Sequence, residues 1–278
     1  MKKGINAWCF PGGMPLHEIF RLAKECRYDG IEINMEAEPA GGEDCPRLYM
    51  SLDARGYQKI RACADSYTLP ISSVSTGLHW TYPLTDNDPA VREKGCEVVL
   101  KMIDAASVFG CDTVLVVPGK VTPDVSYSAA YRRAREALKD LSVYAEEKKV
   151  IIGVENVWNK FLLSPLEMAR FLDEIGSGYV KSYFDAGNVL QFSYPQSWVE
   201  ALGTRIARVH IKDFDTAIGN ITGFKPLLQG EMDWSALMGS LKSVGYDSYL
   251  TAELSPYPTN PLQLIRDTSA AMDYILGL

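Results

Sequence analysis

The stretch Val150-Ile151-Ile152-Gly153-Val154-Glu155 is an almost continuous apolar run that ends in a carboxylate. Such a run is typical of a parallel strand covered on both faces, because a strand with one face in water alternates apolar and polar residues. Seven further short runs recur along the chain, between segments with the apolar spacing of helices. The eight predicted strands span residues 4–10, 30–34, 71–77, 113–118, 150–155, 179–185, 206–211 and 248–253.

The eightfold alternation of strand and helix predicts the fold class, an α/β protein with a (β/α)8 TIM barrel. A weak repeat supports it, because residues 26–29, 109–112 and 244–247 each lead from a helix end through a short turn into a strand. Asn260 and Pro261 are predicted to cap and begin the last helix. A doubly wound sheet is the alternative, but no Gly-x-Gly-x-x-Gly motif follows the first strand.

Length and composition fit one large domain with a substantial core. The chain has 278 residues, of which 47% are hydrophobic and 23% charged, and no linker or low-complexity segment divides it. We therefore expect residues 1–278 to form a single domain. The net charge of −7 and the pI near 5.1 argue against nucleic acid as a partner, because phosphate binding needs a basic face. No apolar stretch reaches the length of a membrane span, so we expect no membrane partner.

The cysteines and the first residues indicate a reducing compartment. All six cysteines lie in the first 111 residues and none forms a Cys-x-x-Cys pair, which predicts reduced thiols rather than disulfides or a zinc ribbon. Met1-Lys2-Lys3 resembles the start of a secretory leader, but the following apolar stretch contains Asn6 and stops at residues 11–13. We expect a cytoplasmic protein. The cysteines are Cys9, Cys26, Cys45, Cys63, Cys96 and Cys111.

Two segments that follow predicted strands are unusually long. Residues 34–51 and 213–234 are polar and rich in glycine and proline, and both exceed the usual loop length. Long loops of this kind are often binding loops or lids. In a (β/α)8 barrel the active site lies at the carboxyl end of the strands, where these segments begin.

Four side chains that can bind a metal end the last four predicted strands. They are Glu155, Asp185, His210 and Glu253, separated by 30, 25 and 43 residues. One β–α unit of such a barrel takes about 30 residues, so these side chains should meet at the barrel mouth. A single carboxylate there is more often a turn residue or a helix cap, but carboxylates after apolar runs are costly without a partner. Three oxygen donors and one nitrogen favour Mn²⁺, Mg²⁺ or Co²⁺, with Zn²⁺ as an alternative.

The motifs around these four residues resemble the xylose-isomerase-like TIM barrel superfamily. The likeness is greatest to its sugar and sugar-phosphate isomerases and epimerases, the ketose 3-epimerase and hexulose-phosphate isomerase group. It rests on residues 153–161 (GVENVWNKF), 183–188 (YFDAGN), 209–213 (VHIKD) and 251–254 (TAEL). The resemblance implies that Glu155, Asp185, His210 and Glu253 bind one divalent metal ion, usually Mn²⁺. It also implies a sugar or sugar phosphate as the small-molecule partner, and we expect a homo-oligomer, a dimer or a tetramer.

The implied reaction, in carbohydrate metabolism, is proton transfer at the carbon next to a ketose carbonyl through a cis-enediolate. Glu155 and Glu253 would be the acid/base pair, removing a proton from one face and returning it on the other, while the metal holds the enediolate charge. An inosose-dehydratase-like lyase, which also expels a β-hydroxyl, is one alternative. A non-catalytic sugar-binding barrel is another. An abasic-site endonuclease disagrees with the three histidines and the acidic pI.

Substrate contacts are predicted near the same strand ends. Asn188 stands where many epimerases have a histidine, and Leu162 where they have a substrate-binding glutamate, and both differences argue against a free ketose as substrate. The Gly187-Asn188 form resembles the sugar-phosphate members. We expect Asn188 to orient a hydroxyl or to cap a helix. His79 follows the third strand, and it is predicted to contact substrate or to be a packed loop residue. Lys212 is predicted to contact substrate and, like the other lysines that follow strands, could hold a phosphate. Those lysines are Lys120, Lys160 and Lys225.

Aromatic residues and one further carboxylate complete the predictions. Trp8 and Trp158, with Phe10, could form an apolar wall against a sugar ring or could belong to the core. Trp234, in a Gly-x-x-x-Trp segment, is expected to pack the long loop that precedes it. Glu32 lies within the second predicted strand, and we interpret it as a structural hydrogen-bond partner.

Overall fold

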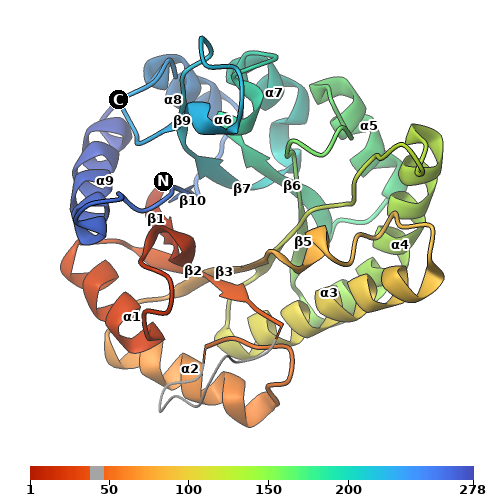
Figure 1. Cartoon of the computed structure of the whole chain (residues 1–278), viewed down its shortest axis with the longest axis horizontal. Coiled ribbons are helices and arrows are strands. Elements are labelled where there is room, and N and C mark those ends of the chain that lie inside the picture. Colours follow the sequence, from red (N-terminus) through yellow and green to blue (C-terminus); the bar gives the residue numbers. More distant parts are fainter. Residues whose placement is uncertain (38–46) are drawn as a thin grey trace.

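A computed structural model describes residues 1–37 and 47–278 of the chain. Cys45 and the middle of the predicted long segment 34–51 lie outside the described residues. Within the described part, eight parallel strands form a closed barrel (Figure 1). They are β1 (Lys2–Asn6), β2 (Gly30–Met35), β3 (Ile71–Thr76), β4 (Thr113–Val116), β5 (Ile151–Glu155), β6 (Val180–Asp185), β7 (Ile206–Ile211) and β10 (Tyr249–Ala252).

The strands follow one another around the ring in the order β1-β10-β7-β6-β5-β4-β3-β2, and β2 pairs with β1 to close it. Helices surround this ring in Figure 1. The longer helices are α1 (Leu16–Glu25), α2 (Ala54–Ser66), α3 (Pro89–Phe109), α4 (Tyr127–Lys148), α5 (Pro165–Ile175), α7 (Pro195–Leu202), α8 (Trp234–Ser243) and α9 (Pro261–Leu276). Short elements lie at the strand ends: η1 (Ala7–Cys9), η2 (Leu78–Trp80), α6 (Ala186–Val189), η3 (Gly203–Arg205) and η4 (Ile221–Gly223). The predicted single-domain α/β barrel is confirmed; that it takes in all of residues 1–278 stays a prediction.

Seven of the eight predicted strands agree with the structure to within two residues at each end. The first was placed too late, because β1 ends at Asn6 rather than at Phe10. The Asn6 side chain accepts a hydrogen bond from the Trp8 backbone N–H at 2.7 Å, which stabilises the turn of η1. The last helix begins at Pro261 as predicted, but Asn260 has φ of 55° and its side chain makes no capping hydrogen bond.

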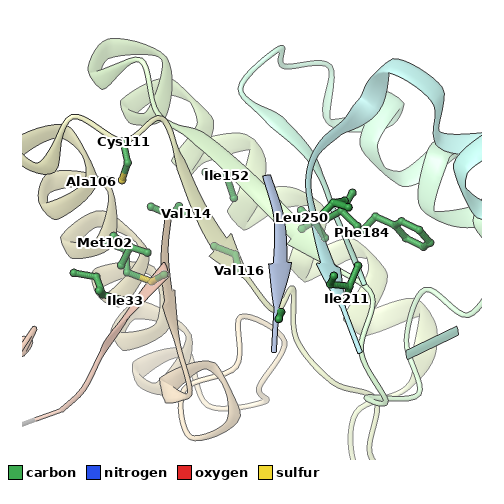
Figure 2. Packing of buried hydrophobic residues seen from close by; sticks show 14 of the residues in the cluster. Ile33, Met102, Ala106, Cys111, Val114, Val116, Ile152, Phe184, Ile211 and Leu250 are labelled. Carbon is green, nitrogen blue, oxygen red and sulfur yellow. The ribbon is translucent and has the colours of Figure 1, made fainter. Parts of the chain in front are cut away.

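The main hydrophobic core lies between the strands and the surrounding helices. Alternate strand residues point outward into it, among them Val114 and Val116 of β4, which lie near Met102 and Ala106 of α3 (Figure 2). The inward-facing residues are largely polar, and a separate small apolar cluster there contains Leu115, Val117 and Tyr183. The strands are therefore held from outside, while polar side chains fill the interior.

Two further features concern the predicted surroundings of the chain. None of the helices in the described ranges combines the length and the apolar character needed to cross a membrane. The cysteines of these ranges carry free thiols, and Cys9 and Cys111 are buried.

Candidate metal centre and active site

The four candidate ligand residues meet at the carboxyl end of the barrel, as the sequence predicts. One atom each of Glu155, Asp185, His210 and Glu253 lies within 4.8 Å of the other three. β5, β6 and β7 supply the first three, and Glu253 directly follows β10. These strands are neighbours in the ring, and register pairs Asp185 with His210. The convergence follows from the closed ring, because each residue lies within one position of the carboxyl end of its strand.

His210 is fully buried at the centre of this group. Its Nδ1 atom lies 3.2 Å from Glu155 Oε1, 3.7 Å from Glu253 Oε2 and 3.9 Å from Asp185 Oδ2. Its other nitrogen, Nε2, lies 2.7 Å from Glu32 Oε1. A histidine that donates a hydrogen bond through one nitrogen to a carboxylate presents the other nitrogen as a metal ligand. Glu32 thus sets the orientation of the imidazole.

Glu32 is itself held by a buried network, which confirms its predicted structural role. Ser73 and the Tyr183 hydroxyl donate to its Oε2 at 2.7 and 2.6 Å, and Asn6 donates to Oε1 at 2.5 Å. Burial alone would raise the pKa of Glu32, but the charge of His210 and the hydrogen bonds from His210, Tyr183 and Ser73 lower it to about 2. Glu32 therefore remains ionised beneath the candidate ligands.

Asp185 is fixed from the neighbouring strand end. The Asn156 side chain bridges to it, accepting from the Asp185 N–H at 2.9 Å and donating to the Asp185 carbonyl at 2.8 Å. Asn188 N–H donates to Asp185 Oδ1 at 2.8 Å, so Asp185 also caps α6. The second oxygen, Oδ2, remains directed at the ligand group. Asn156 was missed from the sequence, because its partner lies 29 residues away across the strand pair.

Lys212 places a positive charge among the carboxylates. Its Nζ lies 2.7 Å from Asp185 Oδ2 and 2.5 Å from Glu253 Oε2. Gly187 makes this approach feasible, since a Cβ there would lie 2.3 Å from Lys212 Cγ. Burial would lower the pKa of Lys212, but the charges of Asp185 and Glu253 raise it instead. The Lys212 ammonium therefore already serves as the counter-charge of the Asp185 and Glu253 carboxylates.

The four groups have different acidities in this environment. Burial, opposed by the His210 hydrogen bond and aided by the charge of Glu253, raises the pKa of Glu155 to about 7. Burial also raises the pKa of Asp185, although Lys212 opposes it. For Glu253, the charges of Lys212 and His210 outweigh burial and lower its pKa. The His210 pKa is raised well above its usual value, because Glu32 and Glu253 outweigh burial.

The donor set fits one divalent ion. Ligand atoms about 2.1 Å from a common octahedral ion lie roughly 3.0–4.2 Å apart, and the three distances from His210 Nδ1 to the carboxylates, 3.2–3.9 Å, fall in this range. Three carboxylate oxygens with one imidazole nitrogen suit Mn²⁺, Mg²⁺ or Co²⁺. Buried carboxylates also need a counter-charge, which such an ion supplies.

A cavity of about 590 Å³ opens directly above these residues. Of the four candidate ligands, Glu155 and Glu253 line it. The predicted contact residues Trp8, Trp158, Asn188 and Lys212 line it as well. A second cavity of about 300 Å³ shares Trp158 and Asn188 with the first. Asn188 is held in place, because its side chain donates to the Asn156 carbonyl at 2.9 Å.

The long segment after β7 forms an ordered cover at one side of the cavity. Two short strands, β8 (Asp213–Phe214) and β9 (Phe224–Lys225), pair antiparallel there. Asp213 Oδ1 accepts from the N–H groups of Phe214 and Met232, both at 3.0 Å. Trp234 Nε1 lies 3.4 Å from Asp213 Oδ2, so Trp234 packs this loop as predicted. This hairpin was missed, because two-residue strands are too short for a periodic pattern.

The other predicted residues differ in where they lie relative to the two cavities. His79 is buried, and its Nδ1 accepts from the Val117 N–H at 3.3 Å. Its position gives no support to the predicted substrate contact. Phe10 is buried in the core. Lys120 donates to the Trp80 carbonyl at 3.0 Å, whereas Lys160 and Leu162 line the second cavity and Lys225 lines the first.

Comparisons with known proteins agree with this arrangement. Residues 20–275 match the family described as xylose isomerase-like TIM barrel. Fructoselysine 3-epimerase of Shigella flexneri is 27% identical over 273 residues, covering 91% of this chain and 90% of that protein. L-ribulose-5-phosphate 3-epimerase UlaE of the same organism is 25% identical, covering 87% of this chain and 83% of that protein. The solved structure of an L-ribulose 3-epimerase superposes with a TM-score of 0.81 at 17% identity, covering 99% of this chain and 94% of that one.

Proposed function

The chain belongs to the xylose isomerase-like TIM barrel family, and on that premise we propose that it is a divalent-metal-dependent sugar or sugar-phosphate epimerase or isomerase. One observation carries the proposal. Glu155, Asp185, His210 and Glu253 converge at the carboxyl end of the barrel, and of these four the two glutamates line the cavity. The similarity to two curated sugar 3-epimerases, whose reactions are isomerisations, supports the same reaction class.

The four converging residues would hold one ion, with Mn²⁺ as the preferred metal. When bound, such an ion polarises the substrate carbonyl and stabilises the negative charge of the enediolate. Asp185 and His210 are fully buried, so their role is to bind the ion. Glu155 and Glu253 can reach both the ion and a ligand in the cavity.

The two glutamates would move the proton. Glu155 ends β5 and Glu253 follows β10, and in the ring β6 and β7 separate these strands. The two carboxyl groups therefore approach a bound sugar from different sides. One removes the proton from the carbon beside the carbonyl, and the other delivers a proton to the opposite face. Inversion at that carbon is the result. Asn188, Lys212, Trp8 and Trp158 would contact the sugar from the cavity wall.

Isotope exchange tests the reaction. Incubation with Mn²⁺ and a panel of free and phosphorylated ketoses in D₂O should place deuterium at C3 for a 3-epimerase, or at C1 or C2 for an aldose–ketose isomerase. Nuclear magnetic resonance locates the deuterium and mass spectrometry gives the product mass. Loss of water from the substrate would identify a lyase and contradict the proposal.

Substitution of either glutamate tests the assignment of the acid/base pair. Glu155→Gln and Glu253→Gln should each lower the exchange rate by about 100- to 10,000-fold, the usual contribution of general acid–base catalysis. The circular dichroism spectrum should be unchanged. Glu146→Gln, at an exposed position on α4, is the matched control and should keep the wild-type rate. Exchange near the wild-type rate in Glu155→Gln or Glu253→Gln would disprove the assignment.

A further inference from the structure

The cavity above the candidate metal centre is larger than a simple sugar requires. Its volume is about 590 Å³. Each heavy atom of liquid water occupies roughly 30 Å³, so a hexose with about twelve heavy atoms fills at most about 360 Å³, and less because its atoms are bonded. Cavities of roughly 300–1,000 Å³ are typical of ligands the size of a drug molecule. Space therefore remains for a second group attached to the sugar.

The two ends of the cavity differ in chemistry. Polar and charged side chains gather at the metal end, where Glu155, Glu253 and Lys212 lie. At the outer end, Trp8, Trp80 and Ile221 line the wall and are 39%, 44% and 70% exposed. Large apolar side chains with this exposure mark a surface that an apolar ligand can cover. The extra space thus lies beside aromatic and aliphatic side chains.

The outer walls face each other across the barrel mouth. Trp80 ends η2, which follows β3, while Ile221 and Phe224 belong to the segment after β7. β3 and β7 stand four positions apart in the ring of eight, on opposite sides. The second wall is built before any ligand binds: the Phe224 ring lies 5.0 Å from the Phe214 ring and 5.2 Å from the Trp158 ring. Aromatic and aliphatic side chains therefore line the outer end from two sides of the barrel, and such side chains bind aromatic rings favourably.

The charges at the outer end do not suit a phosphate. Lys225 is the one cation there among the described lining residues, and no arginine lines the described cavity. Lys212, the other cation, is paired with Asp185 and Glu253 at the inner end, where its Nζ also lies 5.1 Å from the centroid of the Phe224 ring. Phosphate sites generally combine several donors, such as arginine forks or the N–H groups of a helix start. An uncharged group therefore fits the outer end better than an anionic one.

We propose that the outer part of the cavity, between Trp80 and the segment Ile221–Phe224, binds an uncharged aromatic aglycone carried by the sugar. This inference rests on the proposed function, because the glutamates act beside a ketone. An aglycone on the anomeric carbon leaves a ring carbon to carry that ketone. The substrate class is thus an aryl glycoside with one ring hydroxyl oxidised to a carbonyl, and inversion occurs at a carbon next to it.

Three probes test the proposal on the Mn²⁺-loaded protein: methyl 3-oxo-β-D-glucopyranoside, its phenyl counterpart and D-ribulose 5-phosphate. Deuterium exchange should proceed with a kcat/KM at least about tenfold higher for the phenyl than for the methyl compound, as expected for burial of one aromatic ring. Trp80→Ala and, separately, Ile221→Ser should each bring this ratio to within about threefold of one. Tyr194→Ala removes an exposed aromatic side chain that lines neither cavity, and it should keep the wild-type ratio.

Equal kcat/KM values for the phenyl and methyl compounds would overturn the aglycone site, and so would a preference for D-ribulose 5-phosphate over both. Binding of unreactive phenyl β-D-glucopyranoside, measured by calorimetry, separates this inference from the proposed reaction. If the phenyl glucoside binds at least tenfold more tightly than its methyl counterpart but no probe exchanges deuterium, the reaction is wrong and the aglycone site stands. If deuterium exchanges with free ketoses but phenyl and methyl glucosides bind equally, the reaction stands and the aglycone site is wrong.

Discussion

Lys212 binds two carboxylates of the candidate metal site, so a metal ion would compete with its ammonium for them. Its ammonium contacts Asp185 Oδ2 and Glu253 Oε2, two of the atoms of the candidate ligand group. In Lys212→Met the buried Asp185 and the partly buried Glu253 lose their counter-charge, and breaking a buried ion pair in this way typically costs about 3–5 kcal/mol. We expect the free energy of unfolding in chelator to fall by about that amount, and Mn²⁺ to bind more tightly. Urea denaturation and calorimetry measure the two effects.

Lys139→Met, at an exposed position on α4, is the control for loss of a lysine charge. It should change neither quantity. Saturating Mn²⁺ should restore most of the stability that Lys212→Met loses, because the ion replaces the missing charge. Unchanged stability in chelator, or weaker Mn²⁺ binding by the variant, would show that Lys212 does not compete for the site.

At this scale the sequence predicted the ligand group better than its surroundings. The grouping of the four candidate ligands was predictable, because each ends an apolar run in which a lone charged side chain would be costly. Lys212 was predicted to contact substrate or phosphate, although His210 and Lys212 stand two residues apart and so share the inner face. The pairing of His210 with Glu32, 178 residues earlier, depends on strand register, which no local pattern specifies.

Among the elements, the hairpin of β8 and β9 depends on one close contact. A Cβ at Gly230 would lie 2.3 Å from Asp213 Oδ1 and 2.6 Å from the Phe214 carbonyl oxygen. Asp213 holds the start of this segment by accepting from Phe214 and Met232. Gly230→Ala should therefore push the segment away from the cavity wall. We expect faster limited proteolysis between residues 215 and 231, at least about threefold, and a raised KM for any sugar substrate.

Gly239→Ala provides the matched comparison. Gly239 lies within α8, and beyond its chain neighbours and the backbone of its own helix no atom lies within 4 Å of the position of its added Cβ. Alanine is the better helix former, so this variant should keep the wild-type cleavage rate and gain roughly 0.5–1 kcal/mol of stability. Equal cleavage rates for Gly230→Ala and the wild type would show that the contact with Asp213 does not hold the segment.

Elements with a periodic apolar pattern were predictable from the sequence. Features that depend on a single side-chain contact were not. Most strands were located by apolar runs alone, yet β1 stops early because Asn6 caps the next turn. Residues 213–234 were predicted to be a long loop, and the small sheet within them follows from the buried Asp213 side chain. Such a contact depends on tertiary structure that composition and spacing do not contain.

For the molecule as a whole, one buried histidine makes a separable contribution to how stability changes with pH. Burial lowers the pKa of His79 from 6.5 to about 4 in the folded protein. Between these values the unfolded chain binds a proton at His79 that the native state does not, so the contribution of His79 to stability falls as pH drops from 6.5 to 4. Glu155, whose folded pKa of about 7 lies above its ordinary value of 4.5, contributes with the opposite sign, and it does so equally in the wild type and in a His79 variant. The expected loss is about 3 kcal/mol. In His79→Gln this contribution is absent, and urea denaturation at pH 7 and pH 4.5 should show a smaller difference.

His17→Gln, which changes an exposed histidine of α1, is the control and should keep the wild-type pH dependence. Glu32 contributes at lower pH, because its folded pKa of about 2 lies below its ordinary value of 4.5, so its stabilisation is lost only below that value. The window above pH 4.5 therefore separates the two groups. Equal pH dependence in His79→Gln and the wild type would disprove the assignment.

The separation between the outer core and the polar barrel interior has a consequence for altering this protein. The residues that join strands to helices belong to one large cluster, and inward-facing Leu115, Val117 and Tyr183 form a distinct small one. The apolar packing of the helices against the strands thus does not involve the inward-facing side chains. A designer could exchange the inward-facing side chains of several strands together, transplanting another enzyme's reactive groups, and leave the apolar contacts between strands and helices untouched, as long as each buried charge keeps a partner.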